Sequence, residues 1–387
     1  MFSTRTSFDL APNPLSLALA RARAAGRPIL DLTESNPTRA RIPYDGDAIG
    51  AALVEGAFLR YEPAPFGIPS AREAVARDLS MHGTEVDPSR IVLTSSTSEA
   101  YTFLFKLLAD PGDEVLVPVP SYPLFEHLAR LEAVRAVPYR LAYDGAWHAD
   151  VDSARAAITA RTRAVLVVNP NNPTGSYLKK SELASLASLG LPIVSDEVFA
   201  RFPLREDRSR CASALERSAA PLVFALGGLS KLAGLPQMKL AWMAVGGEAP
   251  RVDSALARLE VVADAFLSVG TPVQLALPRL LVSRTTTEEA IRLRTAANLA
   301  SLRAAVAGSA ASVLDAEGGW YATLRLPATE TEEAWVLALL EKDCVYVHPG
   351  HFFDFDREAY IVVSLLTPEA TLQEGINRIV QRVNRMR

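Results

Sequence analysis

The sequence has 387 residues, which is long enough for two domains or for one large domain with a smaller companion. Its 49% hydrophobic and 22% charged residues are ordinary for a globular protein, and a formal net charge of −4 gives no basic surface for nucleic acid. Two cysteines are too few for a disulfide scaffold, and no apolar run reaches 18 residues, so we expect no membrane span. The first residues do not resemble a secretory signal, and we therefore expect a cytoplasmic protein.

The first ninety residues predict helices around one short strand. A helical pattern over 15–25 ends at Gly26 and Pro28, and the apolar run 29–33 is typical of a strand. Amphipathic helices are expected over 48–60 and 70–80. The loop between them, 61–69, contains prolines and glycine that make it a structured turn rather than a flexible linker.

From residue 91 the pattern becomes an alternation of strands and helices, which is typical of an α/β sheet with mostly parallel strands. A helix is expected over 99–108, and strands are expected over 91–94, 114–118, 164–168, 192–194, 222–226 and 240–245. Such sheets bind ligands at the carboxyl ends of their strands. The polar clusters of this chain follow strands in that way, at Ser95–Ser98, Asn169–Gly175, Asp196 and Lys231.

The last third predicts a long helical region over 252–308, followed by short strands, a helix and a final helix from Thr371. The predicted fold class is α/β, with a mostly parallel seven-stranded sheet flanked by helices and a small α+β domain formed by both chain ends. We expect an arm and part of the small domain over 1–47, the large domain over 48–285 and the rest of the small domain over 286–387.

Lys231 is the most unusual residue of the chain. It follows the apolar run 221–226 and two glycines, and a second apolar run returns at 240–245. Burying an unpaired ammonium is costly, so the side chain either reaches water or uses its amine chemically, usually in a Schiff base. The chain has six lysines beside 34 arginines, which draws attention to a lysine at a strand end.

Three further clusters can be combined with this lysine. Ser96 and Glu99 have the spacing of a capping box, and hydroxyls with free amides at a helix N-terminus suit a phosphate, although a plain helix cap is the simpler reading. The turn 169–175 is fixed by two prolines and a glycine and presents Asn172. Asp196 could pair with a buried cation or lie solvated in a loop. A phosphate site, an aromatic plate at Tyr122, an amide, a carboxylate and an amine together describe a bound pyridoxal phosphate.

The motifs Asn-Pro-Asn-Asn-Pro-Thr-Gly at 169–175, Asp-Glu-Val-Phe at 196–199 and Ser-Lys at 230–231, in this order and spacing, resemble those of class I/II aminotransferases, a family of fold-type I pyridoxal-phosphate enzymes. The resemblance covers nearly the full chain and implies that Lys231 carries the cofactor as an internal aldimine and that Asp196 pairs with its pyridine nitrogen. It further implies that Asn172 bonds the 3′-oxygen, that Tyr122 stacks on the ring, and that Tyr61 reaches the phosphate of a neighbouring subunit in a homodimer. The implied phosphate-binding residues are Ser96, Thr97, Ser98, Ser230 and Lys239.

The sequence departs from the family at three positions. Lys239 stands where an arginine usually holds the phosphate, and Phe199 stands where a tyrosine usually contacts the 3′-oxygen. Val362 stands where an arginine normally binds the substrate α-carboxylate. Another arginine has taken that role, or the substrate presents no such carboxylate, or activity is lost. The first candidates for the role are Arg39 and Arg41 beside Asn36, followed by Arg325 and Arg357.

The expected function is transfer of an amino group from an amino donor to a 2-oxo acid, with Lys231 as general base and Asp196 stabilising the protonated cofactor ring. A lyase or decarboxylase of the same fold is the main alternative, since one constellation serves several reactions. A ligand-binding regulator is a further alternative, which the absence of an N-terminal DNA-binding pattern disfavours. No metal is expected, because His348 and His351 lack further ligands.

Overall fold

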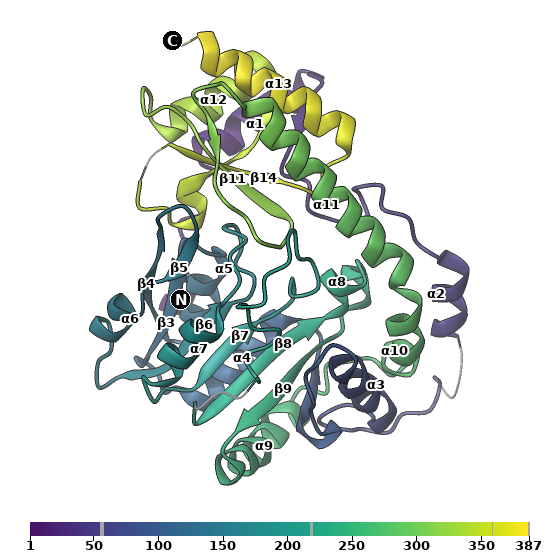
Figure 1. Ribbon diagram of the computed structural model, residues 1–387. Coiled ribbons are helices and arrows are strands. Elements are labelled where there is room, and N and C mark those ends of the chain that lie inside the picture. The colour runs from purple at the N-terminus through teal and green to yellow at the C-terminus, as the bar shows by residue number, and fades with distance from the viewer. Residues whose placement is uncertain (55–57, 217–219, 358, 386–387) are drawn as a thin grey trace.

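A computed structural model describes residues 1–54, 58–216, 220–357 and 359–385. It contains a large sheet between layers of helices and a second, smaller sheet with its own helices (Figure 1). The α/β class predicted from the sequence is therefore confirmed. Within the described residues, no helix has the length and apolar composition needed to cross a bilayer.

Among the residues that the structure describes, the large sheet has eight strands, not the predicted seven. Their order is β2 (Ile91–Thr94), β9 (Ala241–Gly247), β8 (Leu222–Gly228), β7 (Ile193–Asp196), β6 (Thr162–Val168), β3 (Glu114–Val119), β4 (Arg135–Tyr143) and β5 (Trp147–Ala149). All six strands placed from the sequence are present within a few residues of the predicted bounds. The strands that no apolar run indicated are β4 and β5, because β4 is only half-buried near the sheet edge and β5 is a short hairpin partner. Strands β4, β3, β6, β7 and β8 run parallel, while β9 runs antiparallel to both its neighbours.

Helices cover both faces of this sheet, since successive side chains of each strand point to opposite faces. Apolar residues of α4, α5 and α9 pack with Val92, Leu166 and Phe224 on one face. Residues of α2, α3, α8 and α10 pack on the other face, near β2 and β9. On the same face, residues of α6 and α7 pack against β6 and β7. The buried strands are thus apolar on both sides, and polar residues are left to the strand ends.

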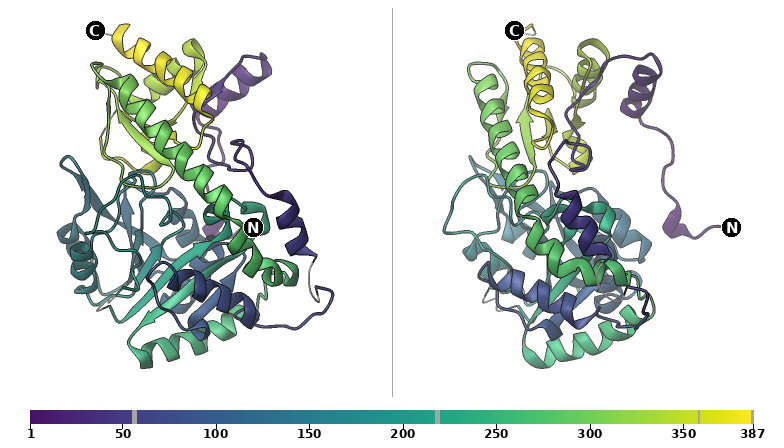
Figure 2. Two further views of the ribbon diagram at one scale, coloured as in Figure 1. Left: turned by 45° about the vertical axis from the view of Figure 1, so that its right-hand side comes forward. Right: turned by 90° about the vertical axis from the view of Figure 1, so that its right-hand side faces the viewer.

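The second sheet has the order β10 (Ser312–Val313), β11 (Tyr321–Arg325), β14 (Tyr360–Ser364) and β13 (His348–Pro349), all antiparallel. Beside it, β1 (Leu30–Asp31) pairs with β12 (Val345–Tyr346). One apolar core joins Leu15 and Leu32 near the N-terminus with residues between Leu299 and Val383. Both chain ends therefore build this part of the molecule, and helix α1 lies against α12 (Figures 1 and 2). The proposed domain bounds at 47/48 and 285/286 stay a prediction.

The helices differ from expectation mainly in their breaks. The region 252–308 is three helices rather than one, interrupted around Leu267, which has a left-handed φ of 43°, and Gly270. The helix predicted over 48–60 ends at Leu53, and part of the predicted range lies outside the described residues. The helices are α1 (Pro14–Ala24), α2 (Gly46–Leu53), α3 (Pro69–Ser80), α4 (Thr97–Leu108), α5 (Leu124–Leu131), α6 (Val151–Ala156), α7 (Lys180–Ala187), α8 (Leu229–Leu232), α9 (Ala249–Asp264), α10 (Thr271–Ser283), α11 (Thr285–Val306), α12 (Glu332–Asp343) and α13 (Glu369–Arg385), with 3₁₀ turns η1 (Thr4–Thr6), η2 (Pro88–Arg90), η3 (Pro236–Met238) and η4 (Gly350–Phe353).

Candidate active site

The neighbouring parallel strands β6, β7 and β8 end at one edge of the large sheet, and a polar residue follows or ends each of them. Asn172 lies in the turn after β6, Asp196 is the last residue of β7, and Lys231 lies in α8 directly after β8. Because parallel neighbours present their carboxyl ends at the same edge, the fold gathers these three residues there.

The two glycines before Lys231 are required by close packing. A Cβ atom on Gly227 would lie 2.6 Å from Nε1 of Trp242 in the adjacent strand, and one on Gly228 would lie 3.0 Å from Ala241. A larger residue would push β8 away from β9, and it would move the start of α8 with it. The glycine pair therefore fixes where the chain leaves the sheet and delivers Lys231.

The amine of Lys231 is buried among aromatic rings. Its Nζ lies 5.2 Å from the centre of the Trp320 ring and 5.5 Å from that of Phe199. Burial lowers the pKa of the amine, and the nearby negative charge of Asp196 opposes this effect. An amine with a lowered pKa is neutral in a larger fraction of molecules, so it can act as a nucleophile or a base.

Asp196 is a buried carboxylate whose hydrogen-bond partners are neutral. It accepts hydrogen bonds from the Tyr101 hydroxyl at 3.3 Å and from the Val198 amide at 3.2 Å. Burial raises its pKa to about 6, although both hydrogen bonds and the positive charge of Lys231 act in the opposite direction. Because burial disfavours the charged carboxylate, a cation placed beside Asp196 would stabilise its charged form.

The turn that carries Asn172 is held by its other asparagines. The Asn169 side chain accepts from the Leu178 amide, and the Asn171 side chain donates to the Pro120 carbonyl and accepts from the Ser121 hydroxyl. Asn172 itself has a buried Oδ1 without any hydrogen-bond partner. Since buried polar atoms are normally paired, this oxygen is available to a ligand.

The predicted phosphate residues lie at the start of α4 and around α8. The Ser96 hydroxyl accepts from the Glu99 amide at 3.2 Å and so serves as the helix cap, while Glu99 accepts from the amide of Ser95 rather than of Ser96. Thr97 and Ser98 form the first helical residues and are half-buried. Ser230 precedes Lys231 in α8, and Lys239 is exposed in a left-handed conformation with φ 49°.

The two predicted tyrosines are placed differently. Tyr122 is 42% exposed after β3, and burial together with the negative charge of Asp196 raises its pKa, so it lies within electrostatic reach of the site. Tyr61 is 72% exposed on the loop before α3, and no contact of the described residues joins it to Lys231. The chain by itself therefore brings Tyr122 to the site and leaves Tyr61 at the surface.

The predicted substrate residues lie in an exposed turn. The Asn36 side chain accepts from the amide and hydroxyl of Thr38, and Arg39 is 75% exposed and forms an ion pair with Glu34 at 3.3 Å. Arg41 is exposed, with φ 58°. Arg325 and Arg357 are exposed as well, so none of the four arginines has its side chain buried toward Lys231.

Residues that sequence reasoning missed come from the second sheet. Tyr321 starts β11 and Trp320 directly precedes it, and Trp320 also packs against Phe199 with ring centres 5.2 Å apart. Burial raises the pKa of Tyr321 to about 12, and its side chain is hydrogen-bonded to Ser35. The sequence signal for this segment was the pair Gly318-Gly319 before Trp320. Gly318 allows a close contact between this segment and Tyr177, because a Cβ on Gly318 would lie 2.4 Å from the Tyr177 ring.

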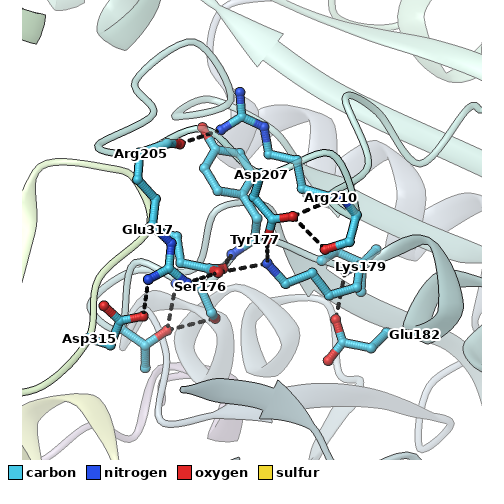
Figure 3. Close-up of polar contacts among 12 residues, drawn as sticks. Ser176, Tyr177, Lys179, Glu182, Arg205, Asp207, Arg210, Asp315 and Glu317 are labelled. Atoms are coloured by element: carbon cyan, nitrogen blue, oxygen red, sulfur yellow. Dashed lines mark hydrogen bonds and ion pairs between the residues drawn. The ribbon is translucent and has the colours of Figure 1, made fainter. Parts of the chain in front are cut away.

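A polar network holds the Trp320 segment against the asparagine turn (Figure 3). Glu317 is 4% exposed and accepts hydrogen bonds from Lys179 at 2.7 Å, from Arg205 at 2.6 Å and from the Tyr177 amide at 2.9 Å. The amides of Glu317 and Gly318 both donate to the Gly175 carbonyl. Glu317 therefore joins the segment that carries Trp320 to the turn that carries Asn172.

Replacing Glu317 with alanine is expected to lower the free energy of unfolding by about 2 kcal/mol, because the buried Tyr177 amide loses its acceptor, while Lys179 and Arg205 keep their ion pairs with Asp207 and Asp315. Chemical unfolding in urea measures the change. Glu206→Ala is the control, since the Glu206 side chain is 90% exposed and its ion pair with Arg210 is long, at 3.9 Å. The control is expected to change stability by less than about 0.5 kcal/mol, and an equal loss in both variants would contradict the role of Glu317.

Glu197 follows Asp196 but lines a separate cavity of about 230 Å³ with Cys211 and Trp242. Its carboxylate accepts from the Ser195 hydroxyl at 2.8 Å and from the Ala214 amide at 2.7 Å, and burial raises its pKa to about 7. The folded protein therefore binds this proton more tightly than the unfolded chain does.

The free energy of unfolding of the cofactor-free protein is expected to fall as pH rises from about 4, the ordinary glutamate pKa, to about 7, the pKa of Glu197 in the folded protein. Above that pH it is expected to level off. The contribution of Glu197 is on the order of 3 kcal/mol. Urea unfolding of wild type and Glu197→Gln at pH 5 and pH 8 checks this, because glutamine keeps the acceptor oxygen but cannot ionise. A variant that loses as much stability as wild type over this range would contradict the assignment.

Comparison with known proteins gives one consistent family. A family model described as aminotransferase class I and II matches residues 29–379. Glutamate-pyruvate aminotransferase AlaA of Escherichia coli K12 is 29% identical over 284 residues, which cover 69% of this chain and 67% of AlaA. Nicotianamine aminotransferase A of Hordeum vulgare is 30% identical over 270 residues, which cover 66% of this chain and 57% of that protein.

Solved structures agree over the whole chain. The structure of an alanine aminotransferase from Pyrococcus furiosus superposes with a TM-score of 0.88 at 23% identity and covers 100% of both chains. A double mutant of Thermus thermophilus aspartate aminotransferase superposes with a TM-score of 0.83 at 25% identity, covering 98% of this chain and 99% of that one.

Proposed function

Because the chain belongs to the class I and II aminotransferase family, we propose that the site around Lys231 binds pyridoxal phosphate and uses it to move an amino group from an amino acid to a 2-oxo acid. The observation that carries this assignment is a half-buried lysine whose amine has a lowered pKa, beside a buried aspartate whose hydrogen-bond partners are neutral. When bound, the cofactor supplies an electron sink for the electrons of a bond broken at the substrate α-carbon.

The residues present fit this cofactor. Lys231 offers an amine to its aldehyde, and Asp196 offers the carboxylate that would keep a ring nitrogen protonated. The unpartnered Oδ1 of Asn172 fits a hydroxyl group of the ring, and Tyr122, which is close enough to feel the charge of Asp196, would cover one face of the ring. Thr97 and Ser98 at the start of the twelve-residue helix α4, with Ser230 and Lys239, would hold the phosphate.

The chain's own groups divide the proton transfers. The neutral amine of Lys231 would take the proton from the α-carbon of the substrate and later return one, and the charged form of Asp196 would keep the ring nitrogen protonated. Phe199 and Trp320 exclude water around the amine, which keeps its pKa low and its lone pair available.

We also propose a homodimer in which Tyr61 completes the phosphate site of the partner subunit. Tyr61 stands at the surface next to the exposed apolar side chains of Phe58 and Leu59, which are 39% and 89% exposed. Such a patch supports an interface between copies. Sedimentation equilibrium tests the assembly, and a protein that remains monomeric at micromolar concentrations would overturn it.

The test of function is a half-reaction screen. The cofactor-loaded protein is mixed with single amino acids, and the cofactor absorbance is followed before and after addition of a 2-oxo acid. Transamination predicts loss of the absorbance band with the donor and its recovery with the acceptor. A lyase would consume the donor without any requirement for an acceptor, and a protein that responds to no amino acid would contradict the proposed function.

A further inference from the structure

The face of the second sheet that is turned away from its own apolar core carries a short row of side chains. Thr323 on β11 pairs with Val362 on β14, and Val362 pairs with His348 on β13. Directly opposed residues of antiparallel strands share a face of the sheet. Their neighbours Ala322, Leu324, Ile361 and Val363 belong to the core on the other face.

This row is joined at both ends to the candidate active site. On one side, β11 is preceded by Trp320, whose ring lies 5.2 Å from the amine of Lys231. On the other side, His348 lies 5.9 Å from the Phe353 ring, and the Phe353 carbonyl accepts from the amide of Ser121, the residue before Tyr122. These contacts connect the row to the segments that carry Trp320 and Tyr122.

Two atoms of the row are buried and unpaired. In the described part of the chain, eight buried side-chain polar atoms lack a hydrogen-bond partner, and among them are Oγ1 of Thr323 and Nδ1 of His348. Thr323 is 2% exposed. Trp320 and Asn172 at the same site contribute two more of the eight. Since an unpaired buried polar group is costly, this clustering points to a ligand that supplies the missing partners.

The charge around the row opposes an anionic ligand. Val362 between the two polar residues is fully buried and apolar. Burial lowers the pKa of His348, and the nearby carboxylate of Asp31, which lies 3.9 Å from Arg23, adds negative charge on this side. The arginine on the same face of β11, Arg325, is exposed at the far end of the strand. A carboxylate placed here would meet a valine at position 362 and an imidazole whose charged form burial disfavours, and burying an unpaired carboxylate is costly.

We propose that Thr323 and His348, with Val362 between them, form a substrate subsite that binds an uncharged hydrogen-bonding group, such as an amide, in preference to a carboxylate. This inference rests on the proposed function. The group is either the end of the amino acid side chain or the substituent at the α-carbon, because both present the same chemistry. The neutral imidazole and the hydroxyl each offer one hydrogen bond, and the valine packs against the group between them.

The test compares matched amide and acid donors in the half-reaction of the cofactor-loaded enzyme. Glutamine against glutamate examines the side-chain end, and alaninamide against alanine examines the α-substituent. Wild type is expected to prefer the amide in one pair. Thr323→Val and His348→Phe are each expected to lower kcat/KM for that amide by at least about tenfold, with a smaller change for the acid. Thr323→Ser keeps the hydroxyl that Thr323→Val removes, and it is therefore expected to have nearly the wild-type kcat/KM for the amide.

Val362→Arg is the converse experiment and is expected to shift the preference toward the acid by at least about tenfold, since it supplies the missing cation. Urea midpoints and cofactor absorbance of all variants establish that they fold. A wild type that prefers the acid in both pairs, or variants that slow both donors equally, would overturn the subsite. If no donor reacts, the proposed function fails, and calorimetric binding of butyramide against butyrate to wild type and Thr323→Val then decides the subsite.

Discussion

Replacement of Lys231 by alanine is expected to abolish amino transfer while leaving the fold intact. Lys231 supplies the buried amine of the site, and its neutral form is favoured by burial among Phe199 and Trp320. Removing it deletes both the attachment point for the cofactor and the base that moves the α-proton. A positioned general base contributes on the order of 10²–10⁴ in rate, so we expect a loss at the upper end of this range or beyond it.

Steady-state transamination and the half-reaction rate measure the effect, and the urea midpoint reports on folding. Lys180→Ala is the matched control, because Lys180 is an exposed lysine at the start of α7. The control is expected to keep the wild-type rate. A Lys231→Ala protein that folds and retains more than about a tenth of the activity would contradict its role as a base, since a general base contributes at least about 10².

Asp196→Asn is expected to lower kcat on the order of 10²-fold with little change in the fold. Asparagine has the same shape, and its single oxygen can accept one of the two hydrogen bonds that Tyr101 and Val198 donate to the two carboxylate oxygens. It removes the negative charge, and with that charge the ability to keep a proton on the cofactor ring. The loss therefore combines the electrostatic contribution with the change of one hydrogen bond.

The neighbouring carboxyl provides the control. Glu197→Gln makes the same chemical change one residue away, at a side chain that faces a different cavity. It is expected to leave kcat within about twofold of wild type, because Glu197 is outside the site, while it changes the pH dependence of stability. Equal losses of activity in both variants would show that the effect comes from local packing rather than from the charge of Asp196.

Much of the architecture could be predicted because it depends on local patterns. The six apolar runs became strands. The prolines and the glycine after β6 form the turn that carries Asn172, and Lys231 lies in the short helix α8 directly after β8. Since parallel strands share one edge for their carboxyl ends, the order of motifs was enough to bring Asp196 and Lys231 to the same place. Strand β4, next to the sheet edge, was missed because its half-exposed residues do not form an apolar run.

The substrate side could not be predicted in the same way. The exposed turn at residues 36–41 offered arginines close in sequence to a predicted ligand turn, yet Arg39 pairs with Glu34 and Arg41 lies at the surface. Their orientation depends on local ion pairs and on a left-handed backbone at Arg41, which a sequence pattern does not report. The sequence showed that Val362 stands where the family has an arginine, but it did not show which residue takes over the role of that arginine.

The sequence by itself determined the α/β class and the identity of the residues at the strand ends, because short apolar runs and turn residues specify those features locally. Only the tertiary structure decided what stands opposite Lys231. The register of β11, β13 and β14 places Thr323, Val362 and His348 in one row, and the Glu317 network holds the segment before β11 against the asparagine turn. These contacts join residues far apart in the chain, and their alignment depends on strand pairing and on buried charge rather than on any local motif.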